Sequence, residues 1–190
     1  MTLLLLGIVI WFAAHLFNRL APAGRARLTE RFGEGSKGII AAVLLGSVIL
    51  MVVGYRGADS TPLYTPLPGI GHLNNLLMVI AFLMFGGGSK GSWLASRMRH
   101  PMLTAVKIWA VAHLLVNGDV ASVVLFGSML IWAVVEVIVI NRTEGDWTPD
   151  KSAKPGARDL RLAIVWLLML GVAAAIHIWL GYNPFQGTYG

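Results

Sequence analysis

The sequence contains no cysteine. A chain without thiols forms no disulfide, builds no thiolate metal site or iron–sulfur cluster, and attaches no haem covalently through a C-x-x-C-H motif. Charged residues are also scarce, at 13% of the 190 residues, whereas hydrophobic residues make up 56%. A soluble domain of this length needs a larger polar surface, so these proportions and the mean hydropathy of +0.71 predict a membrane protein.

Six stretches of the chain are apolar and long enough, or nearly long enough, to form membrane-spanning helices, which need roughly 17–25 residues. They are Leu3–Phe17, Gly38–Gly54, Leu73–Phe85, Met102–Val116, Val120–Ile140 and Leu162–Leu180. The first, third and fourth are short, so five or seven helices are alternatives. The sequence predicts an all-α fold, a polytopic transmembrane bundle of about six spans that occupies residues 1–190 as one domain. A short interfacial helix that ends at Gly33 is expected within residues 25–37.

The basic residues are distributed unevenly among the predicted loops. Thirteen of the fifteen Lys and Arg residues fall in the first, third and fifth loops, one lies in the second loop (Arg56), and Lys107 lies inside a span. By the positive-inside rule, both termini face the non-cytoplasmic side of a bacterial inner membrane. The net charge of +6 then reflects topology and anionic lipid headgroups, and no nucleic-acid partner is expected. The first span lacks a basic segment before it and is expected to be retained, in contrast to a signal peptide.

Polar and ionisable residues inside a span are costly, so each is a candidate functional residue. The predicted topology sorts these residues into an inner and an outer layer. The inner layer contains His15, His100, Lys107 and Glu136, and the outer layer contains His72, His113 and His177.

Two histidines of the fourth span are too far apart to share a small metal ion. His100 and His113 are separated by thirteen residues, which is about 20 Å along a helix. A second ligand must therefore come from another helix, and His15 matches the depth of His100. The pair His15 and His100 is the predicted metal site, and His72 with His113 is the alternative.

Other residues of these layers fit the needs of a haem group, which requires an apolar slot, axial nitrogen ligands and cations for its propionates. Arg97 and Arg99 precede His100 and would supply the cations. Lys107 is expected either to form a structural ion pair with Glu136 or to contact a propionate. Trp109 and His113 share one face of the fourth span, as Trp11 and His15 do in the first.

Several motifs resemble those of the NnrU family, and the likeness extends over about residues 3 to 140. The central block comprises Arg99-His100-Pro101-Met102-Leu103, Lys107-Ile108-Trp109-Ala110-Val111-Ala112-His113-Leu114-Leu115 and Asn117-Gly118-Asp119. Further matching segments are Ala14-His15-Leu16, the Arg-Leu-x-x-Arg-Phe-Gly run from Arg27 to Gly33, Gly54-Tyr55-Arg56, and Leu63-Tyr64-x-Pro-Leu-Pro.

The NnrU family is named for genes associated with denitrification, and it is similar to the haem-dependent zeta-carotene isomerase of plants. This resemblance implies a haem b cofactor and assigns its histidine ligands to His15 and His100. A cysteine has been implicated as an alternative ligand in the plant enzyme, and this chain has no cysteine. A cysteine-for-histidine ligand switch is therefore impossible here.

The functional hypotheses differ in class. The first is a haem b membrane protein whose cofactor-binding residues are His15, His100, Lys107, Arg97, Arg99, Trp109 and His113, working in redox or isomerase-type chemistry on a hydrophobic small molecule. The second is a non-enzymatic accessory or assembly subunit of a nitrite or nitric oxide reduction system, with a membrane-protein partner or a second copy of itself. The third is a group-transfer enzyme that holds an anionic cofactor at Arg97, Arg99 and His100. No catalytic residue is assigned.

Overall fold

The computed structural model describes residues 1–59 and 61–186. The helices of this part of the chain are α1 (Thr2–Leu20), α2 (Pro22–Phe32), α3 (Gly35–Arg56), α4 (Ile70–Gly87), α5 (Trp93–Arg97), α6 (Pro101–Val116), α7 (Val120–Glu144) and α8 (Ala157–Trp179). Extended pairing within the described residues is limited to one isolated bridge between Pro62 and Asp119. The predicted all-α fold is therefore confirmed.

Each predicted span corresponds to one long helix, and the ends agree to within a few residues. Among the described residues, α3, α4, α7 and α8 are long and apolar enough to cross a membrane. The first sixteen residues of α1 pass the same test only together with α2, from which they are bent by 86°, and α6 is shorter, at 16 residues. By length and composition, the described part of the chain thus contains four helices that could cross a membrane, or five if the bent pair counts as one, and the count of six stays a prediction.

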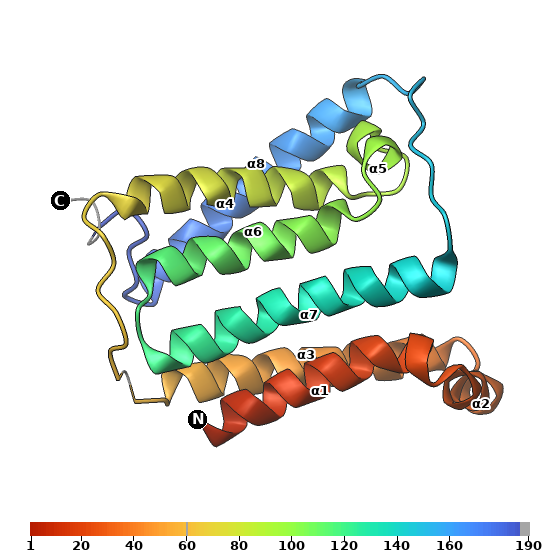
Figure 1. Ribbon diagram of the computed structural model, residues 1–190, viewed down its shortest axis with the longest axis horizontal. Coiled ribbons are helices and arrows are strands. Elements are labelled where there is room, and N and C mark those ends of the chain that lie inside the picture. Colours follow the sequence, from red (N-terminus) through yellow and green to blue (C-terminus); the bar gives the residue numbers. More distant parts are fainter. Residues whose placement is uncertain (60, 187–190) are drawn as a thin grey trace. The chain divides into compact units, whose positions relative to one another are not determined.

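The helices group into two compact units (Figure 1). Unit 1 comprises residues 1–62 and 119–144, with α1, α2, α3 and α7. Unit 2 comprises residues 63–118 and 145–190, with α4, α5, α6 and α8. Each unit therefore combines segments from two distant parts of the sequence.

In unit 1, α1 packs closely along α3. Small residues make this approach possible, because a Cβ atom at Gly54 would overlap backbone atoms of Leu3 and Leu4. Gly7 plays the same part on α1, where a Cβ atom would lie 2.7 Å from the carbonyl oxygen of Ser47. Close backbone contact through small residues is a common means of helix association in lipid, where apolar burial gives little driving force.

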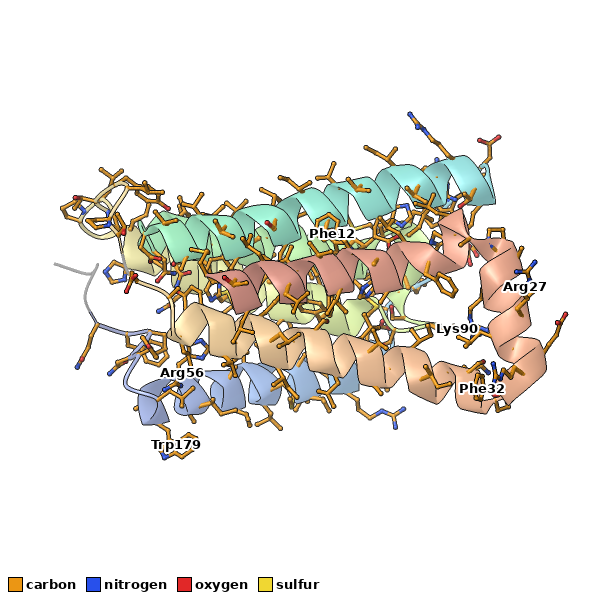
Figure 2. The ribbon with its side chains drawn as sticks, turned by 90° about the horizontal axis from the view of Figure 1, so that it is seen from below. Phe12, Arg27, Phe32, Arg56, Lys90 and Trp179 are labelled. Atoms are coloured by element: carbon orange, nitrogen blue, oxygen red, sulfur yellow. The ribbon has the colours of Figure 1, made fainter. Side chains whose placement is uncertain are left out.

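The short helix α2 begins at Pro22, before the expected residues 25–37, and its last residue, Phe32, is followed by Gly33, whose φ of 54° places it in the left-handed region that glycine adopts readily. Its end at Gly33 was predicted from the sequence. Arg25 of α2 donates a hydrogen bond of 2.9 Å to the hydroxyl of Ser36, which fixes α2 to the start of α3. Figure 2 shows Arg27 and Phe32 at this end of unit 1 and Arg56 at the opposite end of α3.

In unit 2, α4 packs against both α6 and α8. A hydrogen-bond network joins the polar ends of these helices to α5 and to the linker before α8. Trp93 donates its backbone N–H to the carboxylate of Asp159 at 2.7 Å, and Arg158 donates to the carbonyl oxygen of Lys90 at 2.5 Å. Lys90 and Arg158, which lie in two different predicted loops, therefore meet at one end of unit 2.

The outward faces of the helices carry large apolar side chains. Helix α8 has no buried residue, and Leu168 and Trp179 are 66% and 82% exposed. Trp179 projects away from the ribbon at the end of α8 (Figure 2). Apolar surface of this extent is costly in water and favourable against lipid tails, so it supports a position inside a bilayer.

The packing of α1 on α3 predicts opposite effects for two alanine substitutions on α3. Gly54→Ala should destabilise the protein by about 1–3 kcal/mol, because the added methyl group overlaps the backbone of α1. Gly46→Ala should be neutral or stabilising by up to about 1 kcal/mol, because its Cβ atom meets nothing within 4 Å. Thermal unfolding of the purified protein in detergent measures both, and an equal effect of the two changes would contradict this packing.

Candidate functional site

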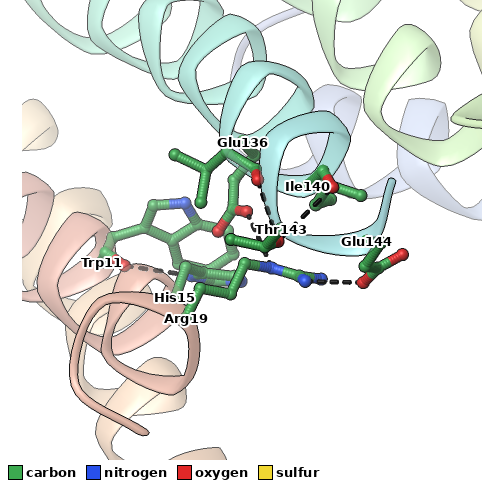
Figure 3. Close-up of polar contacts among 8 residues, drawn as sticks. Trp11, His15, Arg19, Glu136, Ile140, Thr143 and Glu144 are labelled. Atoms are coloured by element: carbon green, nitrogen blue, oxygen red, sulfur yellow. Dashed lines mark hydrogen bonds and ion pairs between the residues drawn. The ribbon is translucent and has the colours of Figure 1, made fainter. Parts of the chain in front are cut away.

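The first candidate site lies in unit 1, where the side chains of Trp11, His15 and Trp132 pack together between α1 and α7. Figure 3 shows Trp11 and His15 beside Arg19 and Glu136. The imidazole ring of His15 lies 4.2 Å from the ring of Trp11 and 4.7 Å from that of Trp132, measured between centroids. The two indoles meet edge to face at 5.2 Å. Trp132 is only 5% exposed, so His15 is held against a buried aromatic wall.

A hydrogen bond to the backbone fixes the orientation of His15. Its Nδ1 lies 3.0 Å from the carbonyl oxygen of Trp11, one turn earlier in α1. A carbonyl oxygen only accepts, so Nδ1 carries the proton and the neutral ring keeps a lone pair on Nε2. Metal-ligating histidines in proteins are commonly oriented in this way, with the second ring nitrogen bound to a carbonyl or carboxylate.

Glu136 on α7 is a buried acidic residue close to this cluster. It is 4% exposed, and its carboxylate lies 3.6 Å from the Nε atom of Arg19. The same guanidinium donates to Glu144 at 2.6 Å. Arg19, which the sequence placed in the first loop, therefore extends back to a carboxylate inside the helix pair. The alternative partner, Lys107, lies in unit 2, and its pairing with Glu136 stays a prediction.

Two polar atoms of this cluster have no partner. Within the described part of the chain, the indole Nε1 atoms of Trp11 and Trp132 are buried and make no hydrogen bond. A buried N–H without an acceptor is costly, and the cost is greatest where no water enters. Two such donors beside His15 mark this position as one where a bound group with acceptor atoms would gain affinity.

Unit 2 contains a second histidine held in the same manner. His113 on α6 places Nδ1 2.9 Å from the carbonyl oxygen of Trp109, and the two rings lie 5.1 Å apart. The sequence pattern is also shared, because Ile10–Leu16 and Ile108–Leu114 both read Ile-Trp-x-x-Ala-His-Leu. Each unit therefore carries one copy of this motif. The two Trp–His faces were predicted separately from the sequence, without the repeat that relates them.

His113 also borders a cavity of about 320 Å³ within unit 2. Side chains from α4, α6, α8 and the segment after α8 line it, and most of them are apolar. His177 belongs to the same lining, and its Nδ1 lies 2.7 Å from the carbonyl oxygen of Ala173. The sequence predicts His177 only as a member of the outer layer and assigns it no ligand role. Its place in a cavity depends on how the segment after α8 folds back, which no local pattern reveals.

The remaining predicted residues lie near the polar end of unit 2. His100 is the residue before the first turn of α6, and Lys107 lies two turns further along that helix. Arg97 donates to the carbonyl oxygens of Lys151 and Ala153, at 2.8 and 3.0 Å. Arg99 donates to the carbonyl oxygen of Gly145 at 2.7 Å. Both guanidinium groups thus hold the linker before α8, and their predicted contact with a cofactor stays a prediction.

The predicted metal pair takes one residue from each unit, because His15 belongs to unit 1 and His100 to unit 2. This pair therefore also stays a prediction, as does the alternative of His72 with His113. Among the described residues, no three His, Asp or Glu side chains converge as a bare metal ion would require. A donor set of single, oriented imidazoles instead fits a cofactor that brings most of the metal's ligands with it, such as haem.

The long apolar helices, with costly polar residues between them, define a multi-pass helical membrane protein. Within that class, the family described as NnrU protein matches residues 3–184, and the chain belongs to the NnrU family. The match extends beyond the segments that the resemblance had covered and includes α8. No curated protein and no solved structure matches the chain significantly.

The contacts of Glu136 predict which cation stabilises it. Arg19→Leu should lower the free energy of unfolding by roughly 3 kcal/mol, because it leaves a buried carboxylate without its nearby cation. Lys107→Leu should cost less than about 1 kcal/mol. Thermal unfolding of both variants in the same detergent tests this order. A larger loss for Lys107→Leu would support the Lys107–Glu136 ion pair expected from the sequence.

Proposed function

We propose that this NnrU-family protein binds haem b within the membrane and takes an axial nitrogen from a histidine of the Ile-Trp-x-x-Ala-His-Leu motif. The observation that carries the proposal is the repeated geometry of that motif. In both copies the histidine Nδ1 is bound to the tryptophan carbonyl oxygen four residues earlier. The imidazole is thereby held in the tautomer whose Nε2 can ligate iron.

The surroundings of His15 support the same proposal. A flat macrocycle gains from aromatic side chains beside its ligand, and Trp11 and Trp132 provide them. The buried Nε1–H groups of these two residues would find acceptors in a bound group. Arg19 lies at the polar end of the cluster and carries the positive charge that haem propionates need. Its guanidinium group also contacts the carboxylates of Glu136 and Glu144.

Bound haem would supply one-electron chemistry or a site for a small gaseous ligand. The protein's own residues would orient the iron ligand through the carbonyl of Trp11 or Trp109 and keep water away from it. This proposal covers redox or isomerase-type chemistry on a lipid-soluble substrate, of the kind that zeta-carotene isomerase performs, and a role in nitrogen-oxide metabolism. All of these depend on the haem.

The membrane placement belongs to the proposal as well. The protein lies in the bacterial inner membrane, with both termini on the non-cytoplasmic side. Within unit 1, the basic helix α2 lies at one end of α3 and Arg56 at the other (Figure 2). The positive-inside rule assigns the end with α2 to the cytoplasm.

The haem proposal predicts a Soret band in protein that is expressed with haem available and purified in detergent. Of the two motif variants, His15→Ala and His113→Ala, the one that removes the iron ligand should reduce the low-spin spectrum by at least about tenfold. His72→Ala and His177→Ala serve as matched controls, and both should retain the band. Absorption spectra and pyridine haemochrome assays of the five single histidine variants measure the effect.

The spectrum of His100→Ala distinguishes iron ligation by a motif histidine from ligation by the pair His15 and His100 that the sequence predicts. Loss of the spectrum in His100→Ala, with His113→Ala unchanged, would assign the ligands to His15 and His100. A colourless, iron-free wild-type protein would overturn the proposal as a whole.

The orientation predicts a difference between two single cysteines, which can be introduced cleanly because the chain has none. Both Asp59 and Glu30 are exposed and lie in unit 1, beyond α3 and on α2 respectively. In intact cells a membrane-impermeant maleimide should label Asp59→Cys and should label Glu30→Cys only after the membrane is opened. The reverse pattern would show that the termini face the cytoplasm.

A further inference from the structure

The cavity of unit 2 contains a buried hydrogen-bond acceptor that has no partner. Asn74 on α4 is 8% exposed and lies in the cavity lining. Within the described residues, its Oδ1 atom makes no hydrogen bond. An amide oxygen buried among apolar groups loses its water without replacement, which is costly. Such atoms are rare in folded proteins, so this one calls for an explanation.

Neighbouring groups fix the orientation of this amide. Asn75 donates from Nδ2 to the carbonyl oxygen of Pro184 at 3.2 Å. Because a carbonyl oxygen only accepts, the amide nitrogen of Asn75 must lie on that side. The Oδ1 atom of Asn75 then accepts from Nδ2 of Asn74 at 3.1 Å. Nδ2 of Asn74 is used in this bond, and its Oδ1 remains as an acceptor.

A second acceptor borders the same cavity. His177 holds its Nδ1 proton against the carbonyl oxygen of Ala173, so its Nε2 is an acceptor in the neutral ring. The rest of the lining is largely apolar and includes Met78, Leu167 and Phe185. A ligand that matches these walls must be mostly apolar and must carry hydrogen-bond donors.

We infer that this cavity binds a quinol, a lipid-soluble aromatic ring that carries hydroxyl groups. A cavity of about 320 Å³ is within the range of small-molecule sites, near its lower end, and suits one substituted ring. The hydroxyl groups of a quinol donate hydrogen bonds to Asn74 Oδ1 and to His177. The corresponding quinone has only acceptor oxygens and leaves Asn74 unpaired. The site should therefore discriminate between the two oxidation states of one molecule.

Quinol binding rests on Asn74, Asn75 and His177, which are assigned no part in ligating iron, and it is independent of a haem held by His15; His113, the other candidate iron ligand, borders the same cavity. A protein that lacks haem can still bind the quinol, and a haem protein can fail to bind it. The two proposals can therefore fail separately.

The experiment compares decylubiquinol, kept reduced under anaerobic conditions, with decylubiquinone on the full-length protein in lipid nanodiscs. Binding is measured as a dissociation constant and as a rise in the thermal unfolding midpoint. The wild type should bind the quinol about tenfold more tightly than the quinone, because only the quinol pairs the buried oxygen of Asn74. Asn74→Leu should lose this preference, with quinol affinity falling about tenfold and quinone affinity unchanged.

Two further variants keep the test decisive if Asn74→Leu does not fold. Asn75→Leu removes the group that holds the Asn74 amide and should weaken the preference for quinol partially. Asn141→Leu, an exposed asparagine on α7 in unit 1, should leave it unchanged.

Several outcomes would overturn the inference. Equal binding of quinol and quinone by the wild type, or a preference that survives in Asn74→Leu, would remove the role of the unpaired oxygen. Equally tight binding of decanol would show a general alcohol site. Loss of a Soret band in Asn74→Leu, together with quinol binding that haem abolishes, would assign the cavity to the haem.

Discussion

The organisation of this protein depends on one constraint, which is that the hydrocarbon interior of a membrane offers no water to polar atoms. Each buried donor or acceptor must find its partner within the chain, and this favours helices that satisfy their own backbones. The side chains follow the same rule. His15, His113 and His177 each turn Nδ1 to the carbonyl oxygen one turn earlier, and Glu136 lies beside Arg19.

The atoms that break this rule identify where other molecules can bind. Among the described residues these include the indole nitrogens of Trp11 and Trp132 beside His15, and the amide oxygen of Asn74 in the cavity of unit 2. The first pair offers donors and the second position an acceptor. A cofactor with acceptor atoms fits the two indole N–H groups beside His15, and a ligand with hydroxyl groups fits the amide oxygen of Asn74. The haem proposal at His15 and the quinol proposal at Asn74 therefore rest on different unpaired atoms, in a chain that matches the NnrU family over residues 3–184.

The sequence predicted the helices well because hydropathy determines them directly, and Gly33 marked the end of α2 through its φ of 54°. It missed α5, which is only five residues long and has no apolar run. The candidate site was harder to predict from the sequence than the helices were. The contact of Arg19 with Glu136 was not predicted, because a long side chain extends from a helix end into the packed interior, whereas the pairing of Lys107 with Glu136 stays a prediction. The cavity beside His113 requires Pro184 and Phe185 to fold back over α8, and no periodicity encodes that return.

The claim that an oriented imidazole of the repeated motif ligates iron can be tested directly by electron paramagnetic resonance of the oxidised protein, labelled with ¹⁵N-histidine. The account predicts a low-spin ferric signal with a nitrogen coupling that changes on labelling and is lost when His15 or His113 is replaced. A ferric signal without histidine coupling, or the absence of any haem iron in protein made with haem available, would contradict it.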